Sequence, residues 1–221
     1  MKRVGIFVLF FSIICCVEKT YSQTDSFAPE WSYGLNGGMT FSKIGFNTNF
    51  SIPQETIKQF SGGLVVRYIS EKHFGIQLEL NYSQRGWKEV TDTIYINKYS
   101  RSLAYIELPF LTHIYFNLDK NVRLIFTLGP QIGYHIGEKE IEREINDEYR
   151  NTSYFDLPVQ QSFDYGLKGS GGLEFRTKAG SIILEGRYYF GLSNIFNSTK
   201  ADLFQASPNQ VIGANLTYLF R

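Results

Sequence analysis

The chain contains little cysteine and, after its first residues, no long apolar run. Both of its two cysteines lie near the N-terminus, within an apolar run at residues 4–17 that follows a short basic start. This run is too short to span a membrane comfortably, and small residues stand at both positions that signal peptidase reads before Gln23. We therefore expect residues 1–22 to be a secretory signal peptide. The mature chain would then have no thiol, disulfide or cysteine metal site.

The chain also lacks an excess of charge of either sign. It has 22 Lys and Arg residues against 21 Asp and Glu residues. Removal of residues 1–22 takes away three basic residues and one acidic residue, which leaves 19 against 20 and a net charge of −1. Nucleic-acid binding would require a basic stripe, so we expect no nucleic-acid partner. No mature segment approaches the roughly 18 consecutive apolar residues of a membrane-spanning helix.

The mature chain instead alternates between apolar and polar residues. Residues 31–42 show this best, because Trp31, Tyr33 and Leu35 alternate with Ser32, Gly34 and Asn36. Such a period of two puts the apolar side chains on one face of a β-strand. The pattern predicts eight strands, at about residues 31–42, 60–69, 74–85, 103–116, 122–136, 163–176, 181–192 and 210–220. The aromatic content of 16% and the 20 glycines are typical of a membrane barrel.

The charged residues decide which face of these strands points inward. A soluble eight-stranded barrel would turn its apolar face inward, but its interior has room only for ordinary side chains and not for so many aromatic rings. We therefore predict the inverted arrangement, an all-β, eight-stranded antiparallel transmembrane up-and-down β-barrel with a charged lumen. Six cations and five anions would pair there as a structural network, since an unpaired buried charge is costly. The predicted network is Arg67, Glu79, Arg85, Glu107, Arg123, Asp164, Lys168, Glu174, Arg176, Glu185 and Arg187.

The lengths of the connections predict how the barrel lies in the membrane. Short links at residues 70–73, 117–121 and 177–180 alternate with long ones at 43–59, 86–101, 137–161 and 193–208. Outer-membrane barrels have short periplasmic turns and long external loops. We therefore expect both termini in the periplasm, with a periplasmic lead at residues 23–30 and the barrel at 31–221.

Aromatic residues at the strand ends would form two girdles at the membrane surfaces. The expected periplasmic girdle is Trp31, Tyr68, Phe74, Phe116, Phe175 and Tyr218. The expected external girdle is Phe41, Tyr82, Trp87, Tyr134, Phe163 and Phe190.

Five stretches of the chain resemble a known family. They are GLNGGMTFSKIG at 34–45, FGIQLELNYSQRGW at 74–87, YIELPFL at 105–111, LGPQIGY at 128–134 and GGLEF at 171–175. With these motifs, the chain is similar to the PorT-like outer-membrane barrels of Bacteroidetes. The resemblance implies the barrel fold and, from the family's namesake, a possible link to protein secretion across the outer membrane.

Few residues suggest chemistry. His135 and Asp164 would meet at the external rim, as in a protease, and Ser83 would suit a lipid hydrolase, but no motif supports either enzyme. His113 is expected in the lumen near Glu107. The acidic segment 137–161 is expected to be a solvated loop, with binding of a cationic partner or of divalent ions as the alternative.

The sequence therefore predicts a non-enzymatic outer-membrane protein, with no catalytic residue, cofactor or metal and with a structural or partner-binding role. The expected partners are outer-membrane lipids and lipopolysaccharide, the barrel-assembly machinery during insertion, and an envelope or secretion-complex protein. The alternatives are an enzyme that acts on lipid or peptide at the external rim, and a small passive pore.

Overall fold

The computed structural model describes residues 27–44, 54–92, 96–144, 158–196 and 207–220. The predicted signal peptide lies outside these residues. The strands are β1 Glu30–Ile44, β2 Gln54–Glu55, β3 Ile57–Glu71, β4 Phe74–Asp92, β5 Ile96–Asn117, β6 Val122–Glu144, β7 Phe163–Arg176, β8 Ser181–Gly191 and β9 Asn209–Phe220. The described residues contain no helix that is long and apolar enough to cross a membrane.

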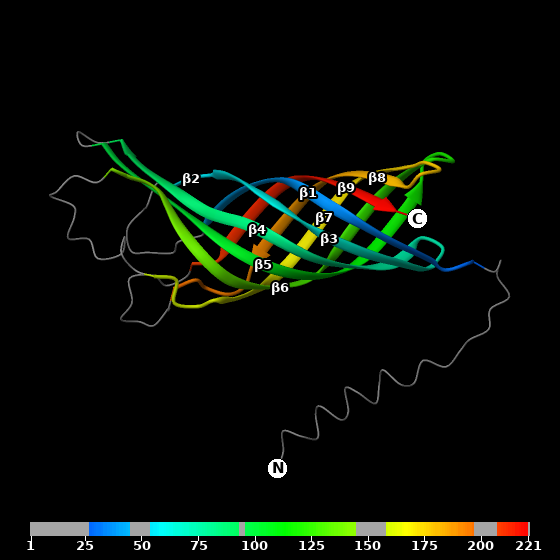
Figure 1. The fold of residues 1–221 in the computed structure, drawn as a ribbon, viewed down its shortest axis with the longest axis horizontal. Coiled ribbons are helices and arrows are strands. Elements are labelled where there is room, and N and C mark those ends of the chain that lie inside the picture. The colour runs from blue at the N-terminus through cyan, green and yellow to red at the C-terminus, as the bar shows by residue number, and fades with distance from the viewer. Residues whose placement is uncertain (1–26, 45–53, 93–95, 145–157, 197–206, 221) are drawn as a thin grey trace, which may run out of the picture.

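The eight long strands close into a ring (Figure 1). Each pairs antiparallel with its neighbours in the chain, and β1 pairs with β9 from Tyr33 opposite Phe220 to Ile44 opposite Asn209. The two-residue strand β2 pairs with β4 beyond the end of the β3–β4 ladder. The predicted fold class is confirmed: the protein is an all-β, eight-stranded antiparallel up-and-down barrel.

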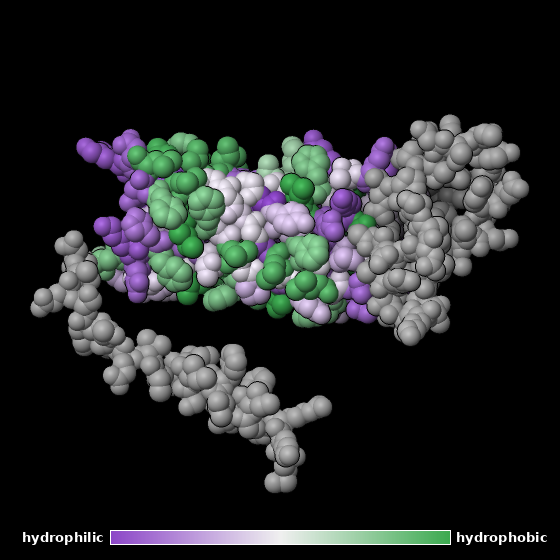
Figure 2. Space-filling view, turned by 180° about the vertical axis from the view of Figure 1, so that it is seen from behind, coloured by the Kyte–Doolittle hydropathy of each residue, from purple (hydrophilic) through white to green (hydrophobic). Residues whose placement is uncertain are grey.

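The alternation along each strand separates the outer wall from the lumen as predicted. On β4, the Leu78 side chain is 41% exposed on the outer wall, whereas its neighbours Gln77 and Glu79 are 4% and 1% exposed. Apolar side chains cover the side of the barrel in Figure 2, and hydrophilic ones gather at its ends. Trp87 contradicts one detail, because it was expected in the external girdle but is only 3% exposed. Trp87 lies two residues after Arg85 on the same strand, so its side chain points to the same, inward side.

Three strands, β4, β5 and β6, are at least seven residues longer than predicted. Residues 86–101 were expected to be a loop, but β4 and β5 remain paired to Asp92 opposite Ile96. The acidic segment from 137 was also expected to be a loop, yet β6 continues to Glu144, which pairs with Lys98. Glutamates at every second residue from 138 to 144 are a strand pattern despite their charge. These stretches of β4, β5 and β6 project past the other strands (Figure 1), and we name them the extension (residues 86–92, 96–102 and 137–144).

The connections separate the two ends of the barrel. Residues 72–73, 118–121 and 177–180 form short links at one end, where β1 begins and β9 ends. We call this the short-turn end. The opposite, long-loop end carries the extension and the long connections (Figure 1).

Inward-facing glycines allow neighbouring strands to approach closely in this narrow barrel. A Cβ added at Gly172 on β7 would overlap the carbonyl oxygen of Leu184 on β8, and one at Gly38 on β1 would overlap that of Ala214 on β9. Larger residues at these positions would therefore force the strands apart.

Candidate functional site

The barrel interior is the largest polar assembly in the described part of the chain, and its centre is Glu79 on β4. The Glu79 carboxylate accepts hydrogen bonds from Lys168 Nζ on β7 at 3.0 Å and from both terminal nitrogens of Arg187 on β8 at 3.1 Å. The amides of Gln77 and Asn81 donate to it at 2.7 and 2.8 Å. Five donated bonds thus surround one buried carboxylate, which compensates for its loss of water.

Glu185 extends this cluster along β8. Its carboxylate accepts from Arg187 at 2.6 Å and from the Ser170 hydroxyl at 2.5 Å. Arg187 therefore bridges Glu79 and Glu185, which lie on different strands. The cluster links β4, β7 and β8 across the lumen.

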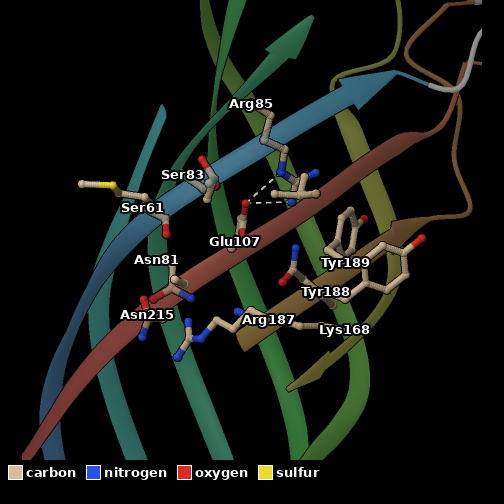
Figure 3. Close-up of a pocket in the computed structure, with 16 residues that line it drawn as sticks. Ser61, Asn81, Ser83, Arg85, Glu107, Lys168, Arg187, Tyr188, Tyr189 and Asn215 are labelled. Carbon is tan, nitrogen blue, oxygen red and sulfur yellow. Dashed lines mark hydrogen bonds and ion pairs between the residues drawn. The ribbon is translucent and has the colours of Figure 1, made fainter. Parts of the chain in front are cut away.

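A second cluster lies nearer the long-loop end around Arg85 on β4. Its guanidinium forms ion pairs with Glu107 on β5 at 2.7 Å and with Asp164 on β7 at 2.5 Å. The guanidinium also lies over the rings of Tyr105 and Tyr189, at 4.8 and 4.3 Å from their centroids. Figure 3 shows Arg85 and Glu107 pointing toward one another. Arg85 is 1% exposed, so this pair is shielded from solvent.

A third cluster occupies the lumen toward the short-turn end. Arg67 on β3 binds Glu174 on β7 through two parallel hydrogen bonds of 2.8 and 3.2 Å. His113 was expected near Glu107, but its Nε2 lies 3.4 Å from Arg67 Nη1. The alternation of β5 predicts that His113 points inward but cannot predict its partner, because partners across a lumen depend on how the ring closes.

Two predicted network members lie at the short-turn end of these clusters. Arg123 donates from Nε to Asn117 at 3.0 Å, and its guanidinium lies 4.1 Å from the centroid of the Tyr115 ring. Arg176 forms an ion pair with Glu30 at 3.1 Å, and both side chains are about a quarter exposed. Arg176 therefore belongs to the rim rather than the lumen.

Charged side chains of both signs lie inside the barrel. Besides Arg101 near the long-loop end, which is 5% exposed, five cations (Arg67, Arg85, Arg123, Lys168, Arg187) and five anions (Glu79, Glu107, Asp164, Glu174, Glu185) lie there. We call these ten residues the charge layer.

Two apolar clusters lie in the lumen, one toward each end. The mouth cluster, at the long-loop end, is Ile44, Trp87, Tyr99, Leu103, Tyr105, Ile195 and Phe196, with Val159 packed against it. The base cluster, at the short-turn end, is Val65, Ile69, Tyr115, Ile125, Ile183 and Leu219, with Phe27 packed against it. Neither cluster was predicted from the sequence, although the inward-facing positions of Tyr99, Leu103 and Tyr105 on β5 could have indicated the first.

Residues 193–196, after β8, hold the mouth cluster in place. Ser193 Oγ donates to Asp164 at 2.5 Å, and the Ile195 carbonyl accepts from the backbone N–H groups of Gln160 and Gln161. Ile195 and Phe196 are 1% and 2% exposed. Because Asp164 also binds Arg85, this segment is tied directly to the charge layer.

The extension continues the network beyond the barrel. Arg101 on β5 forms an ion pair with Glu138 on β6 at 2.7 Å, and its guanidinium lies 6.0 Å from the centroid of the Trp87 ring. Lys139, Glu140 and Ile141 are exposed there. The extension is therefore a charged sheet that stands on the mouth cluster.

A cavity of about 40 Å³ lies beside the charge layer, with Arg85, Glu107, Gln131, Lys168 and Arg187 in its wall (Figure 3). Such a volume accommodates only a few water molecules.

The residues that suggested an enzyme do not form a catalytic arrangement. The Asp164 carboxylate is occupied by Arg85, Tyr189 and Ser193, whereas the His135 ring packs against Tyr105, 5.4 Å between centroids. Ser83 is 3% exposed and lies inside the barrel, where a lipid chain cannot approach it. Within the described ranges, no group of three or more His, Cys, Asp or Glu side chains is placed to hold a metal ion.

A closed eight-stranded barrel with an apolar outer wall and a charged, filled interior defines a membrane barrel of the bacterial outer-membrane type. The chain belongs to the family described as "Outer membrane protein beta-barrel domain", which matches residues 21–197. It is accordingly an outer-membrane protein.

Solved structures with the same fold are distant in sequence. OprG from Pseudomonas aeruginosa is 10% identical with a TM-score of 0.50, over 86% of this chain and 96% of OprG. Neisserial surface protein A is 11% identical with a TM-score of 0.46, over 87% of this chain and 99% of its own. Ail of Yersinia pestis is 11% identical with a TM-score of 0.40, over 86% and 99% of the two chains. Among curated proteins, none matches the sequence. At such identities the likeness concerns the fold alone.

Proposed function

We propose that the protein is a non-conducting, non-enzymatic outer-membrane barrel that acts by binding a partner at its long-loop end. The observation that carries this proposal is the filled interior. The charge layer and two apolar clusters occupy the interior, and the cavity beside the charge layer measures about 40 Å³. A solute would have to displace buried ion pairs in order to pass through the barrel. The function therefore depends on the surfaces of the protein and not on a channel.

The proposed orientation places the short-turn end and both termini in the periplasm and the extension outside the cell. Its support is the division between three short links at one end and the long connections at the other, which is the arrangement typical of outer-membrane barrels. Lipids and lipopolysaccharide would then surround the apolar outer wall, and the barrel-assembly machinery would insert it.

The extension is the proposed binding surface. It raises a charged, three-stranded sheet past the membrane-spanning wall, and its base rests on the buried mouth cluster. A projecting element on a rigid support loses little entropy when it binds a partner. The partner we propose is another protein of the cell envelope. The resemblance of five motifs to PorT-like barrels supports a member of a secretion complex.

Site-specific photo-crosslinking in living cells tests this function. A photoreactive residue at Lys139, on the extension, should give a discrete protein adduct. The same residue at Phe126, which is 45% exposed on the outer wall, should give none, because lipid surrounds it. A third probe at Lys178, in a short turn, examines the opposite end.

The outcomes separate the alternatives. An adduct at Lys178 but not at Lys139 would place the function in the periplasm and overturn the proposed binding surface. Deletion of the gene with no change in the proteins secreted to the medium would remove the secretion link but leave partner binding standing. Hydrolysis of lipid or peptide by the purified protein would overturn the non-enzymatic role.

A further inference from the structure

Gln131 on β6 is a fully buried amide without a protein partner. Its side chain is 1% exposed, and neither its nitrogen nor its oxygen forms a hydrogen bond with any described residue. Buried polar atoms nearly always have a partner, so a buried amide that lacks one on both atoms calls for an explanation.

The sequence around Gln131 explains why no side chain reaches it. The flanking inward positions on its own strand are Gly129 and Gly133. The residues paired with it on the neighbouring strands are Pro109 on β5 and Gly166 on β7. None of these four residues carries a side-chain donor or acceptor. These four neighbours therefore offer Gln131 no side-chain hydrogen bond, and Gln131 borders an open space.

That space is the cavity beside the charge layer. Gln131, Glu107 and Lys168 all contribute to its wall. Lys168 has three N–H donors, one of which is directed at Glu79. On the opposite side Gly213 of β9 adds no side chain. The volume of about 40 Å³ exceeds the roughly 10–15 Å³ that one water molecule requires on this measure.

The polar groups in the cavity wall determine which kind of molecule can bind there. Gln131 presents both a donor and an acceptor, so its partner must be able to accept and to donate. A halide only accepts, a metal ion would serve only the oxygen, and an apolar molecule would serve neither atom.

From these observations we propose that the cavity is a hydration site, in which ordered water bridges the Gln131 amide to Lys168 and Glu107. About one to three molecules fit the volume. The water would connect β6, which contributes no carboxylate or cation to the central cluster, to the ion pairs on β4, β5 and β7. The site does not depend on what the long-loop end binds.

Water-selective NMR on the mature wild-type protein in nanodiscs tests the proposal. The protein is labelled with ¹⁵N at glutamine side chains, and the loss of one amide signal in Gln131→Leu assigns that residue. We expect rotating-frame Overhauser transfer from water to the Gln131 amide. Gln77 is the matched control, because it is also buried but donates to Glu79, and it should show no transfer. A Gln131 amide without transfer, or with a signal of the sign that chemical exchange produces, would overturn the proposal.

The direction in which Gln131→Leu shifts the midpoint of urea unfolding gives an independent test. If water fills the site, leucine displaces it and leaves Lys168 and Glu107 with fewer hydrogen bonds, so the midpoint of urea unfolding falls. If the cavity is dry, leucine removes an unpaired buried amide and the midpoint rises, which would contradict hydration. Should Gln131→Leu fail to fold, Gln131→Asn assigns the signal instead, and the wild-type spectrum then decides.

Discussion

Successive residues of a strand face opposite sides of the barrel wall, and the two sides require different kinds of side chain. On β4, Leu78 contacts the membrane, whereas Gln77 and Glu79 on either side of it lie within a network of hydrogen bonds. The membrane tolerates apolar residues of almost any shape on the outer face. The inner face must match each charge to a partner on another strand. The outer face therefore needs only apolar residues, whereas the inner face needs each charged residue at a position where its partner can reach it. Substitutions on the two faces should differ in their effect on the stability of the barrel.

The largest effect is expected from Glu79→Gln, which keeps the volume of the side chain but removes its charge. Lys168 loses the carboxylate with which it forms an ion pair, and Arg187 loses one of its two carboxylate partners. A buried cation without its partner destabilises a protein by about 3–5 kcal/mol. The measurement is reversible urea unfolding in lipid vesicles. Glu71→Gln, in an exposed position beside a short turn, is the control and should stay within about 0.5 kcal/mol. Equal effects of the two changes would mean that the charge layer contains bulk water.

Trp87→Ala examines the interior where it is apolar. Trp87 packs against Tyr99 and Phe196 in the mouth cluster, and its loss should destabilise the barrel by about 3–5 kcal/mol through the cavity it leaves. Trp31→Ala removes the same side chain from the outer wall, where Trp31 is 56% exposed and contacts Tyr68. That change should cost only about 0.5–1.5 kcal/mol, as expected for one aromatic pair. A reversed order in the same unfolding experiment would show that Trp87 faces the membrane.

Leu78→Arg tests the outer face. An arginine that faces lipid near the midplane destabilises an outer-membrane barrel by about 2–4 kcal/mol. Leu118→Arg makes the same change in a short turn, where the side chain is 61% exposed, and should have little effect. If both variants unfold like the wild type, the apolar wall is not in contact with hydrocarbon.

The smallest difference is expected between two glycines that face opposite ways. Gly172→Ala puts a methyl group against the backbone of β8 and should cost about 1–3 kcal/mol. At Gly186, on the outer face, the nearest atom to an added Cβ is 4.0 Å away, so Gly186→Ala should be close to neutral. The measurement is again the unfolding midpoint. A larger effect at Gly186 would indicate that the two strands are out of register by one residue.

The part of the fold that follows a period of two was predictable from the sequence. Strand β7 was predicted at its observed bounds, and the inward and outward sets of β4 follow from the alternation. The extension was not predicted, because charge was taken as a sign of a loop even where Glu138, Glu140 and Glu142 recur at every second residue. The same error placed Trp87 in the external girdle.

Most of the charged residues of the interior were predictable from the sequence, but their partners were not. The alternation of residues along β3 and β7 is enough to indicate that Arg67 and Glu174 point inward. That they bind one another depends on the closure of β1 on β9 and on how the strands coil, which no local pattern encodes. The mouth cluster was missed for a similar reason, because Ile195 and Phe196 come from a connection that returns over the barrel opening.

Planar-bilayer recording of the purified mature protein tests the central claim, that the interior is sealed. The charge layer and the two apolar clusters predict no steady conductance in the wild type at any protein concentration that inserts barrels into the bilayer. A steady, reproducible single-channel current that is abolished by heat denaturation of the barrel would contradict the claim and would favour a small passive pore over a partner-binding protein.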